Sequence, residues 1–133
     1  MSITALNLAV ESVIDIINGM ENFAQMTRGA LGTADGLACE IAPSIPQEVY
    51  YDKSEYIPLT LALNGKSKNL LTLSDTLNRI ISDLTRRTQY PSGTDWEIVD
   101  ISSGNLPRII GRENNNAWIM AGDLIVKIYE RNE

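Results

Sequence analysis

The residue types that most often carry out chemistry in proteins are scarce in this sequence. Histidine is absent from all 133 residues, which removes the commonest general base, the commonest metal ligand and every histidine-based catalytic triad. The single cysteine, Cys39, has no histidine partner that could generate its thiolate, and we interpret it as a buried structural thiol. These observations favour a protein that is not an enzyme.

Carboxylates are the remaining groups that could act in catalysis or bind a metal. Asp95, Glu97 and Asp100 lie within one predicted strand, and Asp123 lies in another. Their alternation with apolar neighbours is typical of a solvated strand face, and no run of acids at alternating positions matches a calcium-binding loop. We therefore expect no catalytic, cofactor-binding or metal-binding residues in this chain.

Gly65-Lys66-Ser67 matches only the end of a phosphate-binding loop. That loop needs a further glycine five residues before its second glycine, and Thr60 occupies the position. The loop must also lead directly into a helix, whereas residues 67–69 are expected to complete a turn. A nucleotide site is therefore not predicted.

Length and composition are typical of one soluble globular domain covering residues 1–133. Residues 1–65 carry eight acids and two bases, whereas residues 66–133 carry nine of each. A chain with an acidic half and no basic block lacks the charge pattern of a nucleic-acid-binding protein. The first residues do not resemble a signal peptide, and no apolar run reaches the roughly 18 residues of a membrane span. We expect a cytoplasmic protein that binds neither nucleic acid nor membrane.

Two helices are predicted from apolar residues spaced three and four positions apart. The first spans residues 3–17 and ends before Gly19. The second has an apolar stripe over residues 70–84, and it begins either at Asn69 or with a capping box at Thr72.

Period-two alternation and turn residues predict the strands. They cover residues 37–42, 56–63, 95–101, 106–112 and 117–129, with turns at 64–67 and 113–116 and a bulge at Gly122. The order of these elements predicts an α+β fold, mainly an antiparallel β-sheet with two principal helices packed on one face.

The segment over residues 28–56 is long and irregular, and such segments often contact partners. Trp96 and Trp118 lie among apolar strand residues, so we expect them to pack in the core rather than to bind a partner. The candidate interface residues are three tyrosines of the irregular segment and three arginines: Tyr50, Tyr51, Tyr56, Arg86, Arg87 and Arg108.

Four strings within about the last eighty residues carry a resemblance to a known family. They are Tyr56-Ile-Pro-Leu-Thr-Leu, Leu73-Ser-Asp-Thr-Leu-Asn-Arg-Ile-Ile, Trp96-Glu-Ile-Val-Asp-Ile followed by Leu106-Pro, and Ala117-Trp-Ile-Met-Ala-Gly-Asp-Leu-Ile-Val-Lys-Ile-Tyr. The chain resembles the tail terminator, or tail-completion, proteins of long-tailed bacteriophages, which in phages of Gram-positive hosts are often labelled minor capsid proteins. The matching residues are core and turn residues, and none belongs to a catalytic signature.

The resemblance implies a virion assembly protein. Such a subunit would form a homo-oligomeric ring, commonly of six, that caps the tail tube, stops its polymerisation and joins it to the head connector. Its partners would be its own copies, the tail-tube protein and a head-completion protein, at the head–tail junction of the virion and in the host cytoplasm during assembly. The alternative is a small regulatory module that binds one protein partner through its acidic N-terminal half.

Overall fold

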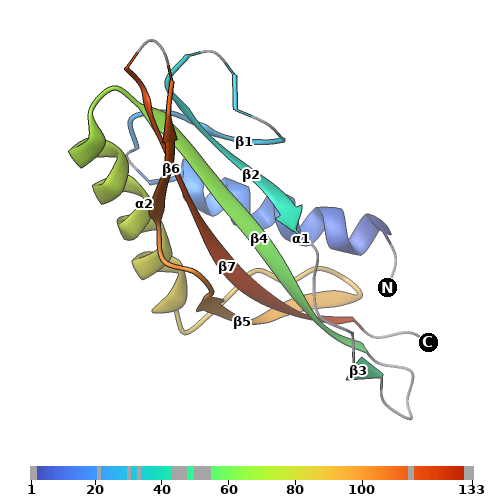
Figure 1. The fold of residues 1–133 in the computed structure, drawn as a ribbon. Helices are drawn as coiled ribbons and strands as arrows, with labels where there is room; N and C mark the ends of the chain where they lie inside the picture. Colours follow the sequence, from blue (N-terminus) through green and yellow to red (C-terminus); the bar gives the residue numbers. More distant parts are fainter. Residues whose placement is uncertain are drawn as a thin grey trace.

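A computed structural model of the chain describes residues 3–20, 22–29, 31–32, 34–42, 48–49, 55–113 and 116–130. The elements follow one another in this order: α1 (Ile3–Asn18), β1 (Met26–Arg28), β2 (Gly36–Ala42), β3 (Glu48–Val49), β4 (Glu55–Ser67), α2 (Leu70–Thr85), β5 (Trp96–Ser103), β6 (Arg108–Arg112) and β7 (Trp118–Glu130). The α+β class predicted from the sequence is confirmed (Figure 1).

All seven strands of the described residues belong to one sheet. Its main order is β1-β2-β4-β7-β5, while β3 pairs with β4 and β6 pairs with β7. Every pairing is antiparallel except that of β1 with β2. The sheet is therefore mainly antiparallel, as expected.

The centre of the sheet is the ladder between β4 and β7. Its register is continuous from Glu55 opposite Glu130 to Ser67 opposite Trp118. Along β4 the side chains of Leu59, Leu61 and Leu63 are buried, while the residues between them are only partly buried. This period-two pattern places one face of the sheet against the helices, and no described residue forms a helix on the other face (Figure 1).

The turn predicted at residues 64–67 is wrong, because β4 continues through these residues to Ser67. Gly65 is required here for close packing rather than for a turn. A Cβ on Gly65 would overlap with Cδ1 of Leu73 in α2 and lie 3.2 Å from Cδ2 of Leu37. The glycine therefore allows α2 to approach the sheet closely.

Both helices pack on the same face of the sheet and bury their apolar stripes in one hydrophobic cluster. Helix α2 begins after Asn69, whose Oδ1 accepts a hydrogen bond from the backbone N–H of Thr72 at 3.1 Å. The second of the two predicted starting points is thus excluded, since Asn69 is the N-cap. Neither helix in the described part of the chain is long and apolar enough to span a membrane.

Part of the segment predicted to be irregular is ordered into strands. The predicted strand at residues 37–42 is confirmed as β2, whereas the short strands β1 and β3 were not predicted. Elements of three and two residues contain too few positions to display a period. Residues 43–47 and 50–54 lie outside the described residues.

Candidate interaction surface

The β5 and β6 strands form one interrupted edge of the sheet. Both strands pair with β7 along the side that β4 does not occupy. The ladder of β5 ends with Ser103 opposite Leu124, and that of β6 begins with Arg108 opposite Ala121. Four residues, 104–107, thus face only two residues of β7, and they form a loop that bulges from the edge.

The loop is held to β7 by hydrogen bonds to Asp123. The N–H of Gly104 donates to the carbonyl of Asp123 at 3.0 Å, and the N–H of Asp123 donates to the carbonyl of Asn105 at 2.9 Å. The Asn105 amide also donates to the Asp123 carboxylate at 2.7 Å. A Cβ on Gly122 would lie 3.1 Å from the nitrogen of Pro107.

The prediction of a β-bulge in β7 at Gly122 is therefore wrong. In the ladder with β4, Gly122 pairs regularly with Leu63, so β7 itself is uninterrupted. The irregularity lies in the facing edge, and the glycine lets the loop cross β7 at close range.

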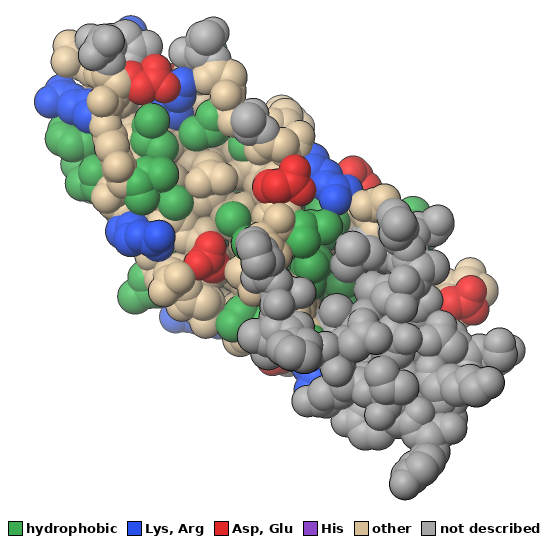
Figure 2. Space-filling model, turned by 45° about the vertical axis from the view of Figure 1, so that its right-hand side comes forward, with side chains coloured by type: hydrophobic (Ala, Val, Ile, Leu, Met, Phe, Trp, Pro, Cys, Tyr) green, Lys and Arg blue, Asp and Glu red, His purple; other side chains and the backbone are tan. Residues whose placement is uncertain are grey.

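Large apolar side chains are exposed along this edge. The exposed fractions are 68% for Leu106, 50% for Ile109 and 53% for Ile110. The register shifts between Ile109 and Gly111, which leaves Ile110 in a bulge without a cross-strand partner. Figure 2 shows hydrophobic side chains, with cationic ones beside them, at the end of the molecule that carries β6 in Figure 1.

We call the exposed residues of this edge the β6 surface. It comprises Leu106, Arg108, Ile109, Ile110 and Arg112.

The charge of the β6 surface is positive. Arg112 lies over the ring of Trp118, with its Cζ 4.4 Å from the ring centroid. Arg108 is exposed and has no ion pair with another described residue. The nearest acid in sequence, Glu113, forms an ion pair with the buried Lys66 instead. The two arginines therefore keep their charge available to a partner.

Lys66 connects two loops at this end of the sheet. Its side chain is 4% exposed, and its Nζ donates to the carbonyl of Gly32 while it pairs with Glu113. Following Glu113, the hairpin turns through Asn116, which has a φ of 69° as expected for an asparagine in a tight turn. These contacts fix the position of the hairpin that joins β6 to β7.

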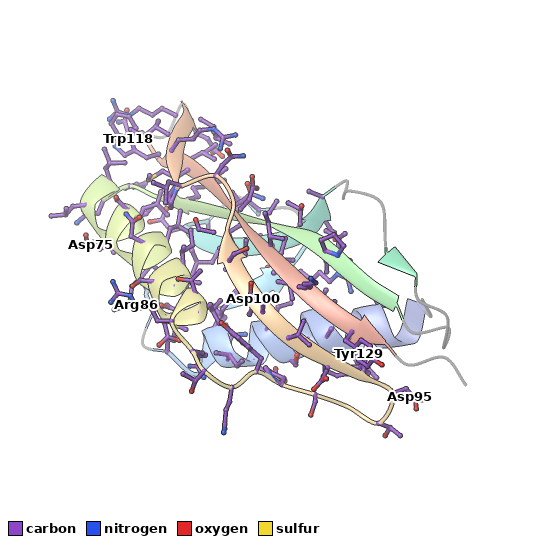
Figure 3. All side chains as sticks on the ribbon, turned by 90° about the horizontal axis from the view of Figure 1, so that it is seen from below. Asp75, Arg86, Asp95, Asp100, Trp118 and Tyr129 are labelled. Atoms are coloured by element: carbon purple, nitrogen blue, oxygen red, sulfur yellow. The ribbon has the colours of Figure 1, made fainter. Side chains whose placement is uncertain are left out.

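The structure does not bring the predicted interface residues together. Arg108 lies on the β6 surface, whereas Arg86 and Arg87 line a hollow at the end of α2, where Arg87 pairs with Asp83 at 2.9 Å. Figure 3 shows Arg86 on α2 and Trp118 at the end of the sheet that carries β6.

The predicted tyrosines contribute little to a described surface. Tyr50 and Tyr51 lie outside the described residues. Tyr56 belongs to β4 opposite Tyr129, and its side chain is not among the described ones. The tyrosine interface remains a prediction.

Sequence reasoning missed the apolar part of the β6 surface. One signal was available, because Ile109 and Ile110 are adjacent and successive strand residues point to opposite faces. At least one of them had to leave the core. The loop at residues 104–107 is indicated by Gly104, Asn105 and Pro107, but its path along β7, which exposes Leu106, depends on the contacts with Asp123.

Of the groups considered for chemistry, Asp123 binds the loop at residues 104–107, whereas Cys39, Asp95 and Asp100 are not part of the β6 surface. Cys39 is fully buried, and its burial raises the pKa of the thiol to about 11, with the nearby Glu40 carboxylate adding to the rise. Asp95 and Asp100 are exposed and labelled in Figure 3, and no group of three potential metal ligands occurs among the described residues. The arrangement of the β6 surface suits binding, because it combines exposed apolar area with fixed positive charge.

Comparison with known proteins adds no family assignment. No protein-family model matches the chain, and no curated protein matches it in sequence.

Proposed function

We propose that this chain is a virion assembly protein of the phage tail-terminator type, a subunit of a ring of about six copies. The ring caps the tail tube, stops its polymerisation and joins it to the head connector. The β6 surface supports this proposal, since it gathers three exposed large apolar side chains beside exposed arginines on one edge of the sheet. The resemblance of the strands and of α2 to tail-completion proteins supplies the biological setting.

Exposed apolar side chains on a sheet edge call for a partner. Leu106, Ile109 and Ile110 are each at least half exposed within a stretch of five residues. Contiguous apolar area of this kind marks interaction sites, and an uncovered strand edge also presents unpaired backbone groups. A protein whose function is assembly would keep both features covered by neighbouring subunits in the finished particle.

The interruption at residues 104–107 favours a closed assembly over an open one. A long straight edge could add strands of further copies without limit. Here the loop held by Asp123 divides the edge into two short pieces. Side-chain contacts at fixed geometry then decide how copies associate, and such heterologous contacts close into a ring when their rotation allows it.

The mass of the purified chain in solution tests the ring. Light scattering behind a sizing column, from about micromolar to millimolar subunit, should detect a discrete species near six times 14.7 kDa as concentration rises. Replacing Ile109 and Ile110 with serine should reduce this species. Leu71→Ser is the matched control, because Leu71 is 71% exposed but lies on α2.

Binding to tail tubes tests the remaining part of the proposal. The chain should sediment with tubes assembled from the tail-tube protein of the same phage and should stop their elongation when it is added early. A chain that neither forms a ring alone nor binds tubes would refute the proposal. It would favour the alternative, a regulatory module that binds one partner through its acidic N-terminal half.

A further inference from the structure

We infer that the β6 surface of one copy docks on the outer face of α1 in a second copy. This outer face consists of Leu8, Glu11 and Asp15. The inference rests on the proposed ring and deepens it, because it names the two surfaces whose repeated contact would build the ring.

The outer face of α1 is acidic and partly apolar. Leu8, Glu11 and Asp15 lie three and four positions apart on one side of the helix, and all three are exposed. Leu8 exposes 50% of its surface. Neither carboxylate has an ion pair with another described residue. The face thus combines an apolar side chain with two available negative charges.

The two surfaces are complementary in chemical character. The β6 surface wraps around a strand edge, with Ile109 and Arg112 opposite Met120 and Trp118 on one face of the sheet and Arg108 opposite Ala121 on the other. The α1 face offers exposed Leu8 beside two carboxylates. When two such surfaces meet, the apolar side chains bury area against each other and the opposite charges around them fix the orientation of the contact. The distribution along the sequence agrees, since residues 1–65 carry the excess of acids.

The two surfaces also lie on different parts of the subunit. Helix α1 lies on one face of the sheet and reaches from β1 to β5, and its outer face is turned away from the sheet. Helix α1 is fastened to the β1 edge, where Asn18 exchanges two hydrogen bonds with Met26, at 2.7 and 3.2 Å, and Asn7 accepts one from Arg28 at 2.8 Å. Strand β6 belongs to the other edge of the sheet. In Figure 1, β6 lies at upper left while α1 extends behind the sheet to the right.

This placement selects the type of symmetry. A copy can use both surfaces at once, each for a different neighbour, because one surface is on the exposed side of α1 and the other is on the sheet edge formed by β6. Contacts between unlike surfaces are heterologous and generate rings or filaments rather than isolated two-fold dimers. The acidic half of the chain, which the alternative function would assign to an unrelated partner, then serves the neighbouring subunit.

Charge reversal gives a decisive test. Arg108→Glu places negative charge on the β6 surface, and Glu11→Arg places positive charge on the α1 face. Each variant alone would oppose like charges at every contact, and we expect its subunit dissociation constant to rise at least about tenfold. Mixed one to one, the variants can alternate around an even-numbered ring, so that every contact again joins opposite charges.

The measurement is the mass of the wild-type chain, of each variant and of the mixture by light scattering at about 0.1 M salt, with circular dichroism to verify folding. The matched controls are Arg79→Glu and Asp75→Arg, which make the same charge changes at exposed positions of α2. We expect both controls to assemble like the wild-type chain. The mixture of the two interface variants should recover most of the assembly that each loses.

Four outcomes would overturn the inference. If Arg108→Glu and Glu11→Arg assemble like the wild-type chain, or if mixing them restores nothing, the ring exists but uses other surfaces. If Glu11→Arg assembles normally while Arg108→Glu does not, the β6 surface contacts something other than α1. If the wild-type chain remains monomeric throughout, self-docking is refuted, and tail-tube binding then decides separately whether the proposed function survives.

Discussion

Replacing Gly65 with alanine tests whether this glycine is present for packing against α2. The added Cβ would overlap with Cδ1 of Leu73, which is fully buried and cannot move into solvent. Leu37 is equally enclosed, and its Cδ2 would lie 3.2 Å from the new atom. The extra methyl group must therefore displace α2 or force a neighbouring side chain out of its rotamer.

The expected loss of stability is moderate. Overpacking a buried site costs about 1–3 kcal/mol, and alanine returns about 0.4–1 kcal/mol because it restricts the unfolded chain more than glycine does. We expect the free energy of unfolding to fall by about 1–2 kcal/mol. For a domain of this size the melting temperature would fall by roughly 3–10 °C.

The assay is urea unfolding followed by tryptophan fluorescence, at one fixed protein concentration because association also affects stability. Gly111→Ala is the matched control, since a Cβ on Gly111 would meet nothing within 4 Å. A second test repeats Gly65→Ala in a Leu73→Ala background, where the added methyl enters the space left by the leucine and should be neutral or stabilising. Equal destabilisation in both backgrounds, or none in either, would refute the packing argument.

Three further predictions follow from single residues. Asn69→Ala should lower the free energy of unfolding by about 0.5–2 kcal/mol, measured in urea, because the N–H of Thr72 loses its cap. Cys39, with a thiol pKa of about 11 against a usual 9.0, should react with iodoacetamide at pH 8 at least about a hundredfold more slowly when folded than in denaturant. The rate of the iodoacetamide reaction with the folded protein should keep rising up to about pH 11. If Cys39 reacts at pH 8 as fast in the folded protein as in denaturant, the thiol is not buried. Lys66→Met should lower the free energy of unfolding by about 1–2 kcal/mol, because Glu113 loses its ion pair but remains partly exposed to water. An unchanged melting temperature would argue that the ion pair does not stabilise the fold.

Periodic patterns predicted the long elements of this fold well. The apolar stripe of α2 is buried as expected. Such elements are set by local spacing, because every third or fourth residue must face the same layer. The strands at the centre of the sheet were found for the same reason.

The errors arose where distant contacts override local preference. Asn64-Gly65 is a common turn sequence, yet β2 and β7 pair with these residues on both sides and keep them extended. Gly122 was correctly identified as unusual, but the irregularity it permits belongs to the loop that crosses it near Pro107. A single sequence does not reveal which distant segment will approach a glycine.

The candidate surface was predicted only in part. Arg108 was selected from the sequence as an interface residue. The isoleucines beside it were assigned to a strand, but no prediction was made of whether their side chains face the core or the solvent. Their exposure follows from the position of β6 at the outer edge of the sheet, with a ladder partner on one side only. Strand order is a property of the whole chain, so no local pattern encodes it.

The central ladder of β4 with β7 has a consequence for synthesis and timing. Its partners lie about fifty to seventy-five residues apart in the chain, so a large loop must close before the two strands can meet. Among the described strands, β6 pairs only with β7, which follows every other described element. We expect that a chain still being translated cannot present its β6 surface in the final geometry. Recruitment into an assembly would then be restricted to subunits whose folding is complete, a form of quality control that requires no additional factor.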